Sequence, residues 1–276
     1  MNKNIAIIGG GNLGRAIAVG LKNAGYLESI KIFLTRRNID HLSDLQGSGI
    51  TVTSDNNQAV TESEIIILAV QPKQLVDVIS DLKPSLDPDR QVLVSVVTGV
   101  SIAEIEHVAG KEFSVIRAMP NTAIAMQESM TCIATNSNKK GVEEVQKIFD
   151  ELGSTLIIEE QMMQAATVLG ACGIAFFLRF IRAASQGGIE VGFHAEEAQL
   201  IAAQTARGAS SLLLNSDDHP EKAIDKVTTP QGCTIAGLNE MEHHGLSSAL
   251  IKGIVTSYKK IENIKQSIPN PSIIED

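Results

Sequence analysis

The sequence predicts an α/β protein of two domains, with a mainly parallel sheet domain at residues 1–160 and an all-helical domain at residues 161–276. Three observations predict this class. An apolar run leads into a glycine-rich turn at residues 5–14, strand-like and helix-like patterns alternate up to about residue 160, and only long alanine-rich helical patterns follow. A length of 276 residues is also sufficient for two hydrophobic cores.

The opening strand, expected at residues 4–8, ends in the G-x-G-x-x-G pattern of Gly9, Gly11 and Gly14. Gly9 permits a tight turn, Gly11 lets a pyrophosphate approach the backbone, and Gly14 lets the following helix pack closely on the strand. The first N–H groups of that helix, expected at residues 12–24, would face the phosphates. Strand, turn and helix stand in the order that dinucleotide binding requires, so the first domain is predicted to be Rossmann-like.

The second strand, expected at residues 29–34, is followed by Arg36 and Arg37. In NAD-binding forms of this fold an acidic residue near this point holds the ribose 2′-hydroxyl, whereas an arginine accommodates a 2′-phosphate. We therefore expect NADP(H) as the cofactor. Asp40 lies close enough to keep NAD(H) as the alternative, and two solvated arginines would be the purely structural explanation.

The remaining sheet elements alternate with short helices. The run at residues 65–70 is wholly apolar, which is typical of a parallel strand buried on both faces, and it ends at Gln71 and Pro72. Ser101 and Glu104 form a capping box that begins a helix. The other strands are expected at residues 50–53, 91–97, 113–119, 130–134 and 155–158, and two further helices at residues 56–63 and 140–152.

The second domain shows helical periodicity at residues 161–185, 195–214 and 245–264. Residues 168–178 are apolar almost all round, which indicates burial on every side. The helical domain is too small to cover this segment alone, so a second copy of the chain is expected to cover it. The tail at residues 269–276 is expected to be irregular.

Composition excludes several classes of function. A formal net charge of −9 argues against a nucleic-acid surface. The three cysteines have no C-x-x-C spacing, so we expect neither a metal site nor disulfides. This favours a reducing, cytoplasmic location. No apolar run reaches the roughly 18 residues of a membrane span, and the first strand leaves no space for a signal peptide. We therefore expect no membrane association.

Strong catalytic groups are not evident in the sequence, because the histidines lie in polar surroundings and there is neither a G-x-S-x-G elbow nor a carboxylate pair. Residues 227–237 instead form a turn rich in hydroxyl groups that contains proline and glycine and opens into a helical segment. Backbone N–H groups in such a turn can bind a carboxylate-sized anion. An ordinary capped helix start is the structural alternative.

The chain resembles the pyrroline-5-carboxylate reductase family over nearly its whole length. The resemblance rests on residues 8–14, on Ala-Val-Gln-Pro at 69–72, on Arg-Ala-Met-Pro-Asn-Thr at 117–122 and on residues 227–238. The family usually has Lys at Gln71, Pro at Ala123, Gly at Gln127 and Ser129, S-G-S-G-P-A-Y at 170–176, and P-G-G or P-G-G-T at 230–233.

The resemblance implies an enzyme of proline biosynthesis that reduces the cyclic imine 1-pyrroline-5-carboxylate to L-proline with NADPH. It implies a homodimer, which can assemble into a larger homo-oligomer. Thr234 would be the catalytic residue, placed by the ring nitrogen. The implied substrate-binding residues are Thr229, Gly232, Cys233, Thr234, Met119 and Asn121. The implied cofactor-binding residues are Gly9, Gly11, Asn12, Leu13, Arg36, Asn56, Ala69, Gln71, Pro72, Val97 and Thr98.

Three alternatives remain open at this stage. A β-hydroxyacid dehydrogenase would need a catalytic lysine on the first helix of the second domain, but residues 161–188 contain none. A reductase of a different imine is the closer competitor. A non-catalytic NADP-binding regulator stays open because residues 170–176 depart from the family pattern.

Overall fold

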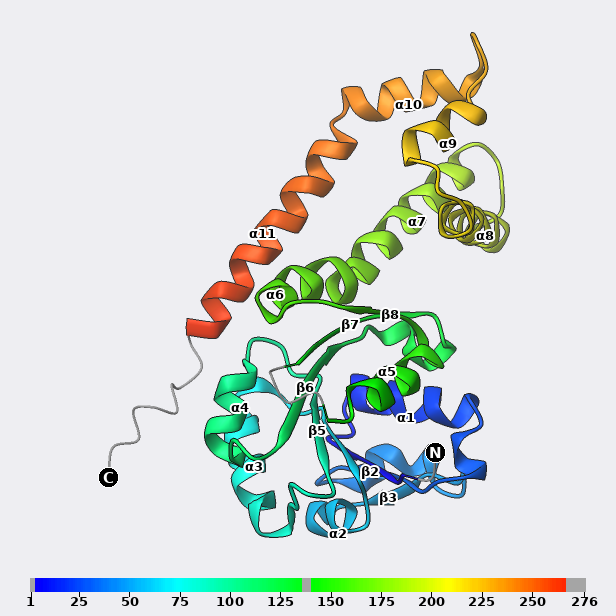
Figure 1. Cartoon of the computed structure of the whole chain (residues 1–276). Helices are drawn as coiled ribbons and strands as arrows, with labels where there is room; N and C mark the ends of the chain where they lie inside the picture. Colours follow the sequence, from blue (N-terminus) through cyan, green and yellow to red (C-terminus); the bar gives the residue numbers. More distant parts are fainter. Residues whose placement is uncertain (1–2, 136–139, 267–276) are drawn as a thin grey trace. The chain divides into compact units, whose positions relative to one another are not determined.

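A computed structural model describes residues 3–135 and 140–266 of the chain (Figure 1). The chain forms two compact units, one of Met1–Cys172 with Ser257–Asp276 and the other of Gly173–Thr256. The first unit thus includes helical residues beyond 160 and the end of the last helix. A functional domain boundary at residue 160 remains a prediction, and the tail expected to be irregular lies outside the described residues.

The first unit contains an eight-stranded sheet in the order β3-β2-β1-β4-β5-β6-β7-β8. Neighbouring strands are parallel except for β6 and β7, which pair antiparallel. The strand order changes direction between β1 and β4, and ligands of doubly wound sheets bind at such a point. The predicted α/β class is confirmed. The strands are β1 Ile5–Ile8, β2 Ile32–Thr35, β3 Thr51–Thr53, β4 Ile65–Leu68, β5 Val92–Ser95, β6 Ser114–Met119, β7 Ser129–Thr135 and β8 Gly153–Ile157.

Helices cover both faces of this sheet (Figure 1). Helices α1 and α5 pack on one face, and α2, α3 and α4 pack on the other. Helix α3 is absent from the sequence expectations, whereas the capping box of Ser101 and Glu104 is present at the start of α4. The helices are α1 Asn12–Asn23, α2 Asn56–Thr61, α3 Leu75–Leu82, α4 Ile102–Ala109, α5 Val142–Asp150 and α6 Met163–Ala166.

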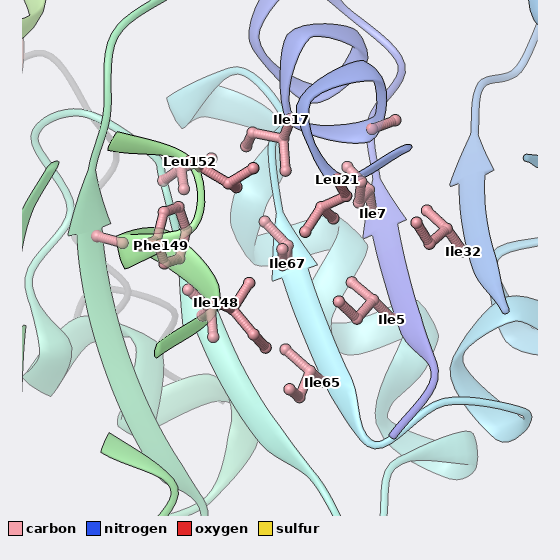
Figure 2. Packing of buried hydrophobic residues seen from close by; sticks show 14 of the residues in the cluster. Ile5, Ile7, Ile17, Leu21, Ile32, Ile65, Ile67, Ile148, Phe149 and Leu152 are labelled. Atoms are coloured by element: carbon pink, nitrogen blue, oxygen red, sulfur yellow. The ribbon is translucent and has the colours of Figure 1, made fainter. Parts of the chain in front are cut away.

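Successive residues of the central strands enter opposite cores, because side chains alternate across a sheet. Ile5 and Ile7 of β1 pack with Ile17 of α1 and Phe149 of α5, as Figure 2 shows. The intervening side chains of β1 pack on the other face with residues of α3 and α4. A strand buried on both sides has to be apolar throughout, which explains the continuous apolar runs in the sequence.

In the part of the chain that the structure describes, five α-helices follow α6. The predicted helical character of this region is confirmed, but residues 167–172 form a π-helical turn that the sequence expectations do not include. Gly170 and Ala171 lie in that turn, where small side chains accommodate a widened backbone. The helices are α7 Gly173–Glu190, α8 Ala195–Leu214, α9 Pro220–Lys226, α10 Cys233–His243 and α11 Leu246–Gln266.

Large apolar side chains of these helices are exposed in the single chain. Phe177 is 63% exposed and Leu178 59%, so the burial on every side that we expected for residues 168–178 is not reached by one copy. Among the described residues, one continuous helix, Glu160–Glu190, has the length and apolar composition of a membrane span. The expectation that no apolar run reaches the length of a membrane span is therefore wrong for this helix. The expectation of no membrane association stays a prediction.

Candidate active site

The glycine-rich turn after β1 has the geometry of a phosphate cradle. Gly9 has a φ of +114°, and a Cβ there would lie 2.5 Å from the carbonyl oxygen of Ala69. A Cβ at Gly14 would lie 2.0 Å from the carbonyl oxygen of Gly9, so only glycine allows α1 to approach β1 this closely. By contrast, a Cβ at Gly11 would meet nothing within 4 Å. The turn is therefore closed on the protein side and open above Gly11, which fits a pyrophosphate.

Hydrogen bonds to β2 fix the glycine-rich turn, and the first backbone N–H groups of α1 beyond it stay free. The N–H of Gly9 donates to Oγ1 of Thr35 at 3.3 Å, and the N–H of Gly10 donates to the Thr35 carbonyl oxygen at 2.6 Å. Helix α1 begins after Gly11 with no side-chain cap and no acidic residue in its first turn. Its first N–H groups and the positive end of its dipole thus favour a bound anion.

A cleft of about 430 Å³ opens at this edge of the sheet. Several predicted cofactor residues line it, whereas Asn12, Leu13, Pro72, Val97 and Thr98 are not among its lining residues. The predicted residues that line the cleft are Gly9, Gly11, Arg36, Asn56, Ala69 and Gln71. Gly10, Thr35, Arg37, Asn38, His41, Ser54, Val70, Gln74 and Val78 also line it.

Arg36 is half-buried in this cleft, where its Nη1 donates to the carbonyl oxygen of Gly10 at 2.8 Å. Arg37 and His41 are exposed side chains of the same cleft. Sequence reasoning missed the contribution of His41 and Ser54. Their signal was position alone, because His41 lies in the segment after the carboxyl end of β2 and Ser54 directly follows β3.

The turn before α10 is also built around backbone groups. The N–H of Gly232 donates to the carbonyl oxygen of Thr229 at 3.0 Å, and Gln231 between them has a left-handed φ of +56°. A Cβ at Gly232 would lie 2.5 Å from Oγ1 of Thr229. Helix α10 then starts at Cys233 without a side-chain cap, and Thr234 is exposed in its first turn. The structure thus places Thr229, Gly232, Cys233 and Thr234 around one uncapped helix N-terminus.

The other two predicted substrate residues, Met119 and Asn121, lie in the first unit and are only 3% and 7% exposed. The Asn121 amide donates from Nδ2 to the Gly170 carbonyl oxygen at 3.1 Å and accepts at Oδ1 from the N–H of Ala123 at 3.0 Å. Because both ends of the amide are engaged, Asn121 holds β6 to the π-helical turn in this structure. Direct substrate contact by Met119 or Asn121 stays a prediction.

A partly buried ion pair that sequence reasoning missed lies in the same unit. Nη1 of Arg117 donates to Oε1 of Glu160 at 3.1 Å, and this oxygen also accepts the N–H of Ile102 at 2.7 Å. Arg117 is 7% exposed, and burial lowers its pKa while Glu160 opposes that effect. A cavity of about 320 Å³ adjoins the pair and is also lined by Gly99 and Ser101.

Other sources of reactivity are limited. Within residues 3–135 and 140–266, no group of three or more His, Cys, Asp or Glu side chains is arranged to hold a metal ion. Burial raises the pKa of the Cys132 and Cys172 thiols, whereas Cys233 is exposed at the start of α10.

Comparisons with known proteins agree with this geometry. Residues 4–99 match the family model described as NADP oxidoreductase coenzyme F420-dependent, and residues 160–264 match pyrroline-5-carboxylate reductase dimerisation. The chain is 48% identical to Pyrroline-5-carboxylate reductase 1 of Dictyostelium discoideum, covering 95% of this chain but 50% of that protein. It is 46% identical to reductase 2 of the same organism, covering 94% of this chain and 92% of that protein.

Among solved structures, the Plasmodium falciparum pyrroline carboxylate reductase with NADP bound has a TM-score of 0.85 at 24% identity, covering 96% of this chain and 98% of that one. This similarity concerns the fold. The fold and the cleft define an oxidoreductase that uses a nicotinamide dinucleotide, NAD(P)H. Full-length similarity to the second Dictyostelium protein places the chain more narrowly, and it belongs to the pyrroline-5-carboxylate reductase family.

Proposed function

We propose that this chain reduces 1-pyrroline-5-carboxylate to L-proline with NADPH, the last step of proline biosynthesis. The observation that carries the proposal is the uncapped start of α10, whose backbone N–H groups at Cys233 and Thr234 suit a small carboxylate, in a chain whose other unit holds a dinucleotide cleft. Family membership supports the same reaction. The relatives named pyrroline-5-carboxylate reductase span nearly all of this chain, although the chain spans only half the length of the first Dictyostelium relative.

The cofactor end of the proposed site uses residues of the first unit. The open backbone above Gly11 and the first N–H groups of α1, at Asn12 and Leu13, hold the pyrophosphate. Arg36 meets the 2′-phosphate, which makes NADP(H) the preferred cofactor and NAD(H) a weaker one. Asn56 lines the adenosine side, and the nicotinamide path is formed by Ala69, Gln71, Pro72, Val97 and Thr98.

The substrate end uses the turn before α10. Backbone donors of Thr229, Cys233 and Thr234 hold the substrate carboxylate, because an uncapped helix N-terminus carries free N–H groups and partial positive charge. The Gly232 N–H, which we expected to join them, donates instead to the Thr229 carbonyl oxygen at 3.0 Å and so shapes the turn. The Thr234 hydroxyl lies by the ring nitrogen and stabilises its proton. Met119 and Asn121 of the first unit are proposed as further substrate-binding residues.

This chemistry explains why the described residues contain no strong acid or base at the turn. A protonated cyclic imine is already electrophilic at carbon, and the nicotinamide supplies the hydride when the cofactor is bound. The protein then acts chiefly by orienting two reactants, and good orientation removes on the order of 7–11 kcal/mol of a barrier. The backbone donors and Thr234 orient the imine by its carboxylate and its nitrogen.

We also propose a homodimer, within a larger homo-oligomer, located in the cytoplasm and not inserted in a membrane. The exposed apolar side chains of α7 and the match of residues 160–264 to a dimerisation family support the dimer. The second copy, rather than lipid, then covers helix Glu160–Glu190.

The direct test is conversion of pyrroline-5-carboxylate by the purified chain. NADPH oxidation and L-proline formation are measured together, and we expect one proline per NADPH consumed. Binding of NADPH without any turnover would favour a non-catalytic regulator, and turnover of other cyclic imines only would indicate a different reductase.

A further inference from the structure

One carboxylate joins three elements of the first unit. Oε1 of Glu160 accepts both the Ile102 N–H at 2.7 Å and a donor from Arg117 at 3.1 Å. Ile102 is the first residue of α4, Arg117 belongs to β6, and Glu160 begins the helical segment that leads to α6. The start of α4 is thus fixed to a neighbouring strand through a residue about 60 positions further along the chain.

This contact controls the loop between β5 and α4. Ser95, the last residue of β5, is in register with Arg117, so the ion pair lies beside the point where the loop begins. The loop passes through Val97 and Thr98, turns at Gly99 with a φ of +84°, and ends at the capped start of α4. The sheet holds one end of the loop, and Glu160 holds the other.

Arg117 and the Ile102 N–H depend on Glu160 as their hydrogen-bond acceptor. Arg117 is 7% exposed, and its buried Nε has no hydrogen-bond partner in the described part of the chain. The Ile102 N–H belongs to the first turn of α4, where backbone donors have no partner within the helix. Replacing the carboxylate by an amide keeps an acceptor oxygen but removes its charge, which leaves the buried guanidinium without an anionic partner and weakens both hydrogen bonds.

From this geometry we infer that Glu160 is a positioning residue for hydride transfer, which acts by holding Val97 and Thr98 against the nicotinamide end of the cofactor. The inference rests on the proposed function for the role of those two residues. Glu160 acts through Arg117 and Ile102, and has no part in proton transfer. The adenosine end, held by Arg36 and the glycine turn, is independent of this contact.

The test compares Glu160→Gln with Glu144→Gln as a matched control. Glu144 also forms an ion pair in the first unit, with Lys3, but it lines neither the cleft nor the cavity. We expect Glu160→Gln to lower kcat by up to about 10²-fold, because misplacement of a reactant by about 1 Å has effects of that size. The Kd of NADPH should stay within about threefold, and the kinetic isotope effect with C4-deuterated NADPH should rise, since hydride transfer becomes more rate-limiting.

Ser101→Ala provides a second variant that leaves the ion pair intact. Ser101 caps the same helix end, accepting the Glu104 N–H at 3.3 Å, so its loss should produce the same kcat-specific defect in a milder form. If Glu160→Gln does not fold, Glu160→Asp, which keeps the charge on a side chain one methylene shorter, decides the question by the same kcat and isotope-effect measurements. Unchanged kcat and isotope effect in the folded variants would overturn the inference, as would a loss of kcat in proportion to the folded fraction.

A separate measurement distinguishes this inference from the proposed function. The fluorescence anisotropy of the bound NADPH nicotinamide reports how firmly that ring is held, whatever the second substrate is. We expect it to fall in Glu160→Gln and to stay unchanged in Glu144→Gln. If the parent chain fails to reduce pyrroline-5-carboxylate, the proposed function fails, and the anisotropy still tests the positioning role. Equal anisotropy in the parent and Glu160→Gln would contradict that role.

Discussion

Arg36 donates through Nη1 to the carbonyl oxygen of Gly10 at 2.8 Å, which joins the end of β2 to the glycine-rich turn after β1. The guanidinium thereby lies in the cleft beside the backbone that would hold the pyrophosphate. A guanidinium has five N–H donors, so one bond to Gly10 leaves donors for a phosphate. The same side chain thus shapes the turn and supplies positive charge.

Arg36→Glu should weaken NADPH binding much more than NADH binding. The change replaces attraction to the 2′-phosphate by repulsion, and hydrogen bonds to charged groups contribute about 1.5–3 kcal/mol, or on the order of 10–100-fold in Kd. Titration of cofactor fluorescence with both nucleotides checks this, with Lys22→Glu, an exposed charge reversal at the other end of α1, as the control. Equal losses for NADPH and NADH would refute a role in 2′-phosphate recognition.

Gln231→Gly should raise the melting temperature, because Gln231 has a φ of +56° in the turn before α10. A side chain in the left-handed region is strained, and glycine relieves this at some entropic cost, for a net gain of about 0.5–1 kcal/mol. Thermal unfolding of the variant measures the effect. The neighbouring change Gly232→Ala is the contrasting control, since its Cβ would lie 2.5 Å from Oγ1 of Thr229 and should lower the melting temperature. A Gln231→Gly protein that melts below the parent would show that the glutamine side chain stabilises the turn.

Alkylation by iodoacetamide should label Cys233 before Cys132 and Cys172. Cys233 is exposed, whereas burial raises the pKa of the other two thiols and so lowers their thiolate fraction at neutral pH. Peptide mass spectrometry gives the order of labelling. The labelled protein should lose imine reduction but keep NADPH binding, and Cys233→Ser should resist inactivation. Faster labelling of Cys132 or Cys172 would contradict this order.

Phe177→Glu should convert the protein to a monomer or prevent its folding, because Phe177 is 63% exposed in the single chain and needs a second copy to cover it. Sedimentation velocity measures the state of assembly. Gln186→Glu, which introduces the same charge at an exposed polar position of α7, serves as the control. A parent chain that is folded, active and monomeric at low micromolar concentration would disprove an obligate dimer.

The glycine-rich turn and the central strands could be predicted because each depends on local rules. Gly9 and Gly14 have the contacts that only glycine permits, and β1 and β4 lie within the expected apolar runs. Helix α3 was missed, although Leu75 and Ile79 are buried at helical spacing, because Pro72 and nearby polar residues obscured its start.

The long-range parts of the site could not be predicted. Glu160 meets Arg117 and the start of α4 only after the sheet has formed, and no local pattern links residues 43 and 58 positions apart. The left-handed conformations at Gln127 and Gln231 could not be predicted either, because a glutamine in a sequence does not indicate a positive φ. The glycines that the family usually has at both positions are the available clue to these conformations.

The most direct test of the account is Thr234→Val, measured as turnover of pyrroline-5-carboxylate alongside the Kd of NADPH. Valine keeps the shape of threonine but removes the hydroxyl assigned to the ring nitrogen, and a lost donor to a charged group costs about 1.5–3 kcal/mol. We predict a turnover lowered on the order of 10–100-fold, unchanged NADPH binding, and substantial activity in Thr234→Ser. Turnover by Thr234→Val at the parent rate would contradict the account and leave Thr234 as a packing residue at the start of α10.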